Sequence, residues 1–139
     1  MENTVTIKLD ESEIKDGMKP VDKYLYDVGP YARWFDETCM AWTKNPESNF
    51  FFLKTQQCYA NELLKAKRHL FLNEVYDMLG IPRTRAGQVV GWTYEENNPI
   101  GDNFVNFGLY AEHNAKFING YEKSVLLDFN VDGNILDRI

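Results

Sequence analysis

The chain has few of the residues from which common catalytic and structural sites are built. Its 139 residues include two cysteines, two histidines and three serines. Two cysteines are too few for a disulfide framework, and we expect Cys39 and Cys58 to be reduced and mostly buried. His69 and His113 have no further His or Cys at ligand spacing, so no zinc site is predicted. No serine lies in a nucleophile elbow, and neither cysteine has the partners of a Cys–His nucleophile.

Long apolar runs are also lacking. The longest is Phe50–Leu53, whereas a membrane span needs ~20 residues. No charged region followed by an apolar one opens the chain, so we expect no signal peptide and a cytoplasmic location. Apolar residues make up 44% of the chain and aromatic residues 14%, which is typical of a packed domain. The length fits a single globular domain.

Positive charge is scarce at both ends of the chain. The net charge is −6, distributed as −4 over residues 1–37, +3 over residues 38–94 and −5 over residues 95–139. The middle band contains Lys65, Lys67, Arg68, Arg83 and Arg85. Because DNA binding needs a net basic face, the acidic balance argues against direct nucleic-acid binding, and a solvated helix face is the simpler interpretation of the band.

Helices are predicted in the first half. Thr4–Leu9 alternates like a short strand, and the polar residues 11–22 are typical of a connector. Pro30 favours the first turn of a helix over Tyr31–Trp42. Apolar residues then recur at three- and four-residue steps over Phe50–Leu79, which predicts one long helix, capped by Ser48 or Asn49 and ended by Gly80. Its length predicts either a kink or a first turn that extends beyond the rest of the domain.

The pattern changes to alternation from Gln88 onward. Residues 89–94, 103–110 and 124–131 are predicted strands, with Val105, Phe107 and Leu109 on one face. Asn119-Gly120 and Asp132-Gly133 are strong hairpin signals. We therefore predict an α+β domain, in which N-terminal helices, including one long helix, precede a C-terminal antiparallel meander of about four strands.

Calcium is the one cofactor that a motif suggests. Asp128, Asn130 and Asp132, followed by Gly133 and Ile135, match the first eight positions of an EF-hand loop. Position 12, where a bidentate Glu belongs, is Ile139, and the entering segment alternates like a strand. We therefore favour a turn at Asp132-Gly133 that joins two strands over a calcium site.

Leu79-Gly80-Ile81 resembles the turn of a helix-turn-helix, in which Arg83 and Arg85 would lead the second helix. Gly87 would break that helix early. The favoured alternative is that Thr84 caps a single turn before the first strand.

Two sets of residues are candidates for binding a partner. Residues 95–103 are rich in side-chain oxygens, and we expect Glu95, Glu96 and Asp102 to be exposed there. Aromatic residues are concentrated early in the chain and are the type that dominates interface hot spots. The candidates among them are Tyr31, Trp34 and Trp42. Core packing is the alternative role for these rings.

The sequence PYARWFDE and the later blocks LFLNEVYDMLGIPRTRAGQVVGW, NPIGDNFVNFGLY and NGYEKSVLLDFNVDGNI are distinctive. They closely resemble the C-terminal domain of an uncharacterised protein family found in phages and prophages of anaerobic Gram-positive bacteria. The resemblance starts near Pro30, so it implies the family domain over residues 30–139, while residues 1–29 are predicted from their own pattern to be an N-terminal strand and connector. Together they are expected to form one globular domain. Many relatives carry hydrophobic segments upstream, and no membrane role is expected for this chain. The expected location is the host cytoplasm.

Two classes of function remain as hypotheses. The first is a non-enzymatic module that binds a host or phage protein, as an acidic anti-defence or anti-CRISPR inhibitor would; a virion or assembly component, with self-association, is the alternative. The second is a small hydrolase with paired acids. Its carboxylates would be drawn from Glu95, Glu96, Asp102, Asp128 and Asp137.

Overall fold

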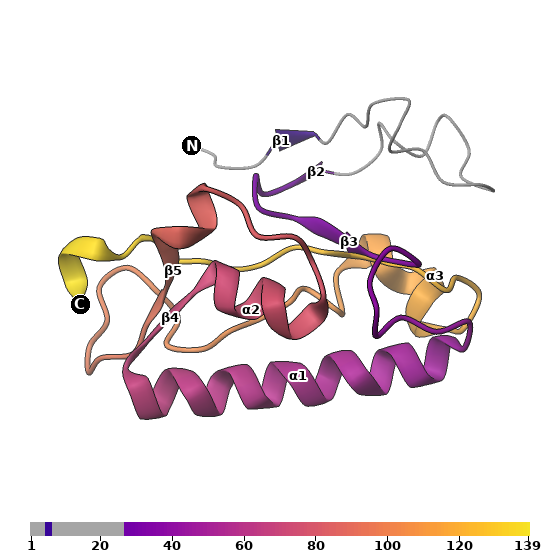
Figure 1. Cartoon of the computed structure of the whole chain (residues 1–139), viewed down its shortest axis with the longest axis horizontal. Helices are drawn as coiled ribbons and strands as arrows, with labels where there is room; N and C mark the ends of the chain where they lie inside the picture. Colours follow the sequence, from indigo (N-terminus) through magenta and orange to yellow (C-terminus); the bar gives the residue numbers. More distant parts are fainter. Residues whose placement is uncertain (1–4, 7–26) are drawn as a thin grey trace.

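The computed structural model describes residues 5–6 and 27–139, in which three helices are interspersed among seven short strands (Figure 1). The helices are α1 (Pro46–Lys67), α2 (Leu72–Leu79) and α3 (Ala115–Ile118), with 3-10 turns at Ala86–Gln88, Glu112–Asn114 and Leu136–Arg138. The strands are β1 (Val5–Thr6), β2 (Asp27–Val28), β3 (Arg33–Phe35), β4 (His69–Phe71), β5 (Val90–Thr93), β6 (Val125–Leu127) and β7 (Gly133–Asn134). The predicted α+β class is confirmed. The predicted connector lies outside the described residues.

The strands form three antiparallel sheets instead of one C-terminal meander. β1 pairs with β2, β3 pairs with β6, and β4, β5 and β7 form the third sheet in that order. In register, Phe35 lies opposite Val125 and Leu70 lies opposite Trp92. Of the C-terminal strands, β6 pairs with β3 near the start of the described chain, whereas β7 pairs with β5, which itself pairs with β4. The meander prediction is therefore correct only in strand direction.

The long helix is shorter than predicted. Asn45, not Ser48 or Asn49, caps α1: its side chain accepts hydrogen bonds from the backbone N–H groups of Glu47 and Ser48. The helix ends at Arg68, which takes a left-handed φ of 71° and donates its N–H to the Leu64 carbonyl. The Arg68 guanidinium lies 5.3 Å from the centre of the Tyr94 ring. The chain then forms β4 before α2 begins, and α2 ends at the left-handed Gly80, as predicted.

The predicted helix over residues 31–42 is wrong. Phe35 enters the main core, whereas Trp34 packs against a second cluster made by Val28, Ala32 and Leu126. Apolar side chains on alternate sides favour a strand, which β6 completes. Asp36 then accepts hydrogen bonds from the N–H and hydroxyl of Thr38, and this turn ends β3.

Residues 103–110 are not a regular strand, although Val105, Phe107 and Leu109 are buried as the alternation predicted. Side-chain amides of α1 bind their backbone: Asn61 pairs with both backbone groups of Val105, and Gln57 accepts from the N–H of Phe107. These amides occupy positions that a neighbouring strand would otherwise take.

Neither predicted hairpin turn joins two strands of a hairpin. Gly120 follows α3, and Asp132-Gly133 leads into β7, whose partner is β5. The turn signals were correct about backbone conformation, because Gly120 and Gly133 both have positive φ.

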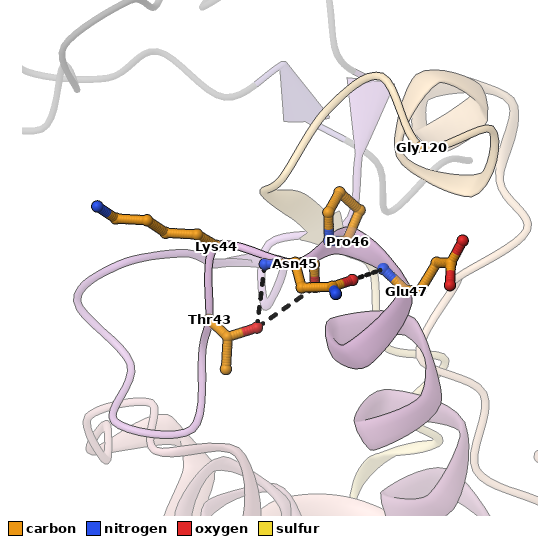
Figure 2. A pocket seen from close by; sticks show the side chains of 6 residues that line it. All are labelled: Thr43, Lys44, Asn45, Pro46, Glu47 and Gly120. Carbon is orange, nitrogen blue, oxygen red and sulfur yellow. Dashed lines mark hydrogen bonds between the residues drawn. The ribbon is translucent and has the colours of Figure 1, made fainter.

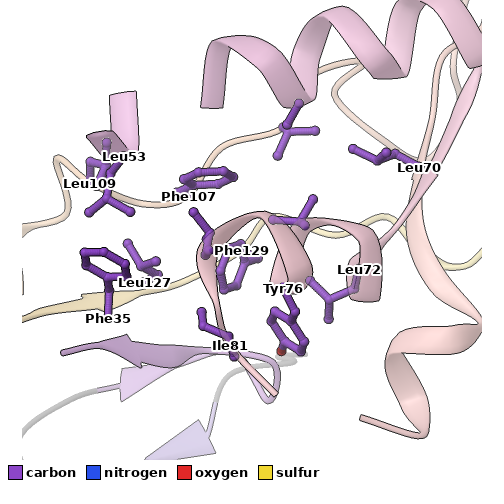
Figure 3. Close-up of a cluster of buried hydrophobic side chains, with 14 of the residues drawn as sticks. Phe35, Leu53, Leu70, Leu72, Tyr76, Ile81, Phe107, Leu109, Leu127 and Phe129 are labelled. Carbon is purple, nitrogen blue, oxygen red and sulfur yellow. The ribbon is translucent and has the colours of Figure 1, made fainter. Parts of the chain in front are cut away.

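The main core lies between α1 and the layer of α2 and the sheets (Figures 1 and 3). Its largest fully buried side chains include Trp92, Tyr76, Phe35 and Phe107. The Phe129 ring meets those of Tyr76 and Phe107 edge to face, at 5.6 and 5.5 Å between ring centres. Each such side chain stabilises the fold by about 1.5–3 kcal/mol through burial.

Candidate partner-binding site

Two segments that are distant in sequence meet at the end of the molecule where the chain terminates (Figure 1). They are the loop after β5, residues 95–104, and the C-terminal 3-10 turn. Arg138 links them, because its Nη2 donates a hydrogen bond of 2.9 Å to Asn98 Oδ1 and lies 3.1 Å from Glu95 Oε1. We call the outer side chains of these segments the loop–turn surface: Glu95, Glu96, Ile100, Asp102, Phe104, Leu136, Asp137 and Ile139.

Asparagine side chains fold the loop. Asn98 Oδ1 also accepts from the N–H groups of Ile100 and Gly101, and its Nδ2 donates to Asn103 Oδ1 at 2.8 Å. Asn103 in turn pairs with both backbone groups of Glu95. Asn97 and Asn103 have left-handed φ values of 56° and 62°, a conformation that Asn tolerates well. The loop is therefore closed by its own amides.

A buried carboxylate lies beneath the loop. The Asp132 side chain is 1% exposed, and its Oδ2 accepts from the Thr93 N–H at 3.0 Å. Arg138 Nη1 lies 3.7 Å from Oδ2, while Asp132 Oδ1 has no hydrogen-bond partner. Burial raises the pKa of Asp132, and the hydrogen bonds from Thr93 and the charge of Arg138 oppose that increase. Gly101 packs on this carboxylate so closely that a Cβ there would lie 2.1 Å from Oδ1.

The loop–turn surface combines apolar and acidic side chains. Ile100, Phe104, Leu136 and Ile139 are 62%, 45%, 50% and 56% exposed. Glu96, Asp102 and Asp137 are exposed beside them in sequence, and Glu95 is half-buried by its contact with Arg138. A fixed loop with exposed apolar side chains and carboxylates is suited to bind a partner that is apolar and basic.

The early aromatic candidates lie elsewhere and are half-buried. The Tyr31 carbonyl accepts from the Tyr76 hydroxyl, and its ring packs on the main core. Trp34 packs on the second cluster. Trp42 donates its indole N–H to the Lys123 carbonyl at 3.0 Å. These contacts show that all three take part in packing, and the structure does not bring them to the loop–turn surface.

The oxygens of the calcium motif bind three different parts of the protein. Asp128 Oδ1 accepts from the Gly29 N–H, Asn130 Oδ1 accepts from the Trp92 indole, and Asp132 binds Thr93. In residues 5–6 and 27–139, no three His, Cys, Asp or Glu side chains form a group that could hold a metal ion.

The acids proposed for hydrolysis have separate contacts as well. Glu95 pairs with Arg138, Asp102 accepts from Asn130, and Asp128 accepts from Gly29. Glu96 and Asp137 are exposed. The most buried carboxylate of this region is Asp132, which the hydrolase hypothesis did not include.

The middle basic band is divided among local contacts. Lys67 pairs with Glu74, Arg68 lies over Tyr94, and Arg83 forms a two-pronged pair with Asp77. The helix-turn-helix interpretation is wrong, because Arg83 and Arg85 precede only a three-residue turn and β5 follows. Thr84 Oγ1 accepts from the Gly87 N–H, so the single capped turn is confirmed.

A shallow hollow of about 590 Å³ lies at the N-terminus of α1 (Figure 2). Thr43, Lys44, Asn45, Pro46, Glu47 and Gly120 line it. Asn45 already satisfies the first free N–H groups of the helix, and Glu47 adds negative charge. The backbone N–H groups that usually hold an anion at a helix N-terminus are therefore already engaged here.

Sequence reasoning found the acids of the loop–turn surface but missed Asn98, Arg138 and the buried position of Asp132. The density of asparagine in residues 97–103 was a signal for a loop closed by side-chain amides. The expectation that both cysteines are mostly buried is confirmed for Cys39 and wrong for Cys58, whose thiol is exposed. No helix in the described part of the chain is long and apolar enough to cross a membrane.

Comparison with known proteins places the chain in one family. Searches of curated proteins and of solved structures give no match. A family model described as "Family of unknown function (DUF6353)" matches residues 2–139, which includes the segment before Pro30. With nearly its whole length matched, the chain belongs to this family of unknown function.

Proposed function

We propose that the protein is a non-enzymatic protein-binding module of a phage or another mobile element, and that the loop–turn surface binds a host or phage protein in the host cytoplasm. The observation that carries this proposal is the exposure of four large apolar side chains next to carboxylates, two on the loop and two on the C-terminal segment, with the two segments held together by Arg138 and the loop closed by Asn98 and Asn103. A fixed loop loses little conformational entropy on binding, so more of the contact energy contributes to affinity.

Charge indicates the kind of partner. Residues 95–139 carry −5 of the net charge of −6, and complementary charge speeds encounter with a basic surface. A basic host protein that handles nucleic acid has such a surface, and an acidic protein bound there would exclude the nucleic acid. This is the anti-defence or anti-CRISPR form of the proposal. A virion or assembly component remains the alternative.

The test is a tagged pull-down from host lysate at low and moderate salt, with a variant and a matched control. Glu96→Lys with Ile100→Ser changes one acid and one exposed apolar side chain of the loop–turn surface. Glu122→Lys with Tyr121→Ser makes the same kind of change at another exposed site, where Tyr121 is 82% exposed. A basic host protein retained by the wild type and the control, but lost with the first variant and with salt, supports the proposal.

Two results would change the conclusion. Recovery of phage structural proteins, or detection of the protein in purified particles, supports the virion alternative. A partner that both variants retain equally contradicts the assignment of the loop–turn surface.

A further inference from the structure

No helix or strand of residues 27–139 covers the outer face of α1. Its buried residues, Asn49, Leu53, Ala60 and Leu64, follow one side of the helix. Figure 1 shows the other described helices and sheets on that same side, above α1. The opposite side consists of exposed residues at three- and four-residue steps. Along its middle these are Phe51, Thr55, Cys58 and Glu62, with Lys54 and Lys65 beside them.

The side chains of this face are available for contact. Phe51 is 72% exposed and Tyr59 49% exposed, and the Cys58 thiol is free. Lys54 lies 5.4 Å from the Phe50 ring centre, and no ion pair within the described residues involves Lys54 or Glu62. The face therefore carries one large exposed ring together with charges of both signs that form no ion pair within the described residues.

The order of charges along this face is self-complementary. Lys54 stands four positions before Cys58, and Glu62 stands four positions after it. If a second α1 lies antiparallel with Cys58 at the two-fold axis, each Lys54 faces Glu62 of the second copy, twice per dimer. Phe51 and Lys65, seven positions before and after Cys58, then also face each other, which places an ammonium near an aromatic ring. The antiparallel arrangement also sets opposite ends of the two helix dipoles together.

We propose that the outer face of α1 binds the same face of a second copy of the chain, antiparallel and centred on Cys58. This interface is separate from the loop–turn surface. The dimer therefore presents two copies of that surface, and either proposal can fail without the other.

The first test measures association by sedimentation velocity over a concentration series. Glu62→Lys places like charges opposite each other twice per dimer, and we expect it to weaken association about tenfold. Lys54→Glu with Glu62→Lys exchanges the two charges and restores both pairs, so its association should return to the wild-type level. Glu122→Lys is the control for a charge reversal outside α1 and should behave as the wild type.

The second test determines the register with a short bis-maleimide cross-linker, because helix axes in contact lie about 8–10 Å apart. Cys58 should give a cross-linked dimer, and Cys58→Ser should abolish it, since Cys39 is buried. In the control Thr55→Cys with Cys58→Ser, the two thiols are displaced by about 9 Å along the helix axis, so we expect weaker cross-linking. A wild-type protein that stays monomeric over the whole series, failure of the charge exchange to restore association, or stronger cross-linking at position 55 overturns the proposal.

Discussion

The main core and the loop–turn end are stabilised in different ways. In the core, rings such as Phe107 and Trp92 are fully buried, and burial of apolar area dominates. At the loop–turn end, asparagine amides and the Arg138–Asp132 contact hold the chain, while Ile100 and Leu136 remain at least half exposed. Polar groups fix the loop there, so its apolar side chains are not needed for the fold. The comparison teaches that apolar side chains stay exposed where polar contacts, and not burial of apolar area, hold the chain.

The largest expected effect concerns the core. Phe107→Ala removes a fully buried ring that contacts Phe129. We expect a loss of about 3–5 kcal/mol in the free energy of unfolding, measured by urea denaturation. Tyr121→Ala, at a ring that is 82% exposed and outside both proposed interfaces, is the control and should change the stability by less than about 0.5 kcal/mol. Equal losses would contradict the assignment of the core.

The next effect concerns the buried charge at the loop–turn end. Arg138→Met leaves the Asp132 carboxylate, 1% exposed, without its neighbouring cation. We expect a loss of about 2–3 kcal/mol by urea denaturation. Adding Asp132→Asn removes the isolated charge, so the double variant should regain part of the loss. A double variant that loses the sum of the two single effects would show that the pair does not interact.

The same two regions explain how much of the structure was predictable from the sequence. Alternation located the buried Val105, Phe107 and Leu109, and Gly80 was correctly predicted to end α2, because each signal depends on near neighbours. The break at Arg68 had no local signal: no Gly or Pro lies there, and the left-handed residue follows from the pairing of Leu70 with Trp92.

The candidate site was predictable only in its exposed part. Glu95, Glu96 and Asp102 lie in a loop that could be predicted because residues 95–103 are mostly polar. That Asp132 is buried beneath Gly101 and beside Arg138 depends on the pairing of β7 with β5, which joins residues about 40 positions apart. The turn signal at Asp132-Gly133 described the backbone but not the strand partner.

A smaller loss of stability is expected from substitutions of two glycines, which distinguish a steric clash from backbone strain. Gly101→Ala would place a Cβ 2.1 Å from Asp132 Oδ1, so the loop must shift. We expect a loss of about 1–3 kcal/mol and chemical-shift changes over residues 95–104 in NMR spectra. Gly120→Ala is the control: its Cβ meets nothing within 4 Å, but its φ of +83° is strained for alanine. It should lose about 1 kcal/mol and leave the shifts of the loop unchanged, whereas shifts of the loop in both variants would contradict a local contact.

The smallest expected effect is on the pH dependence of stability, to which the buried carboxylate of Asp132 and the exposed carboxylate of Asp77 contribute in opposite directions. Burial raises the pKa of Asp132, whereas the hydrogen bonds from Arg83 lower the pKa of Asp77. The folded state therefore binds a proton at Asp132 more readily than the unfolded state, and this contribution to stability is lost as pH rises through the Asp132 pKa. Asp77 acts in the opposite sense: its contribution is present above the ordinary Asp pKa and is lost as pH falls through its lowered value. A carboxyl ¹³C NMR titration should give a pKa above the ordinary Asp value for Asp132 and below it for Asp77. The substitution Arg83→Gln should raise the pKa of Asp77 and leave the pKa of Asp132 unchanged. A pKa of Asp132 below the ordinary value would mean that the charge of Arg138 has a larger effect on this carboxyl than burial has. In that case charge attraction holds the loop–turn end, even though the Asp132 side chain is buried.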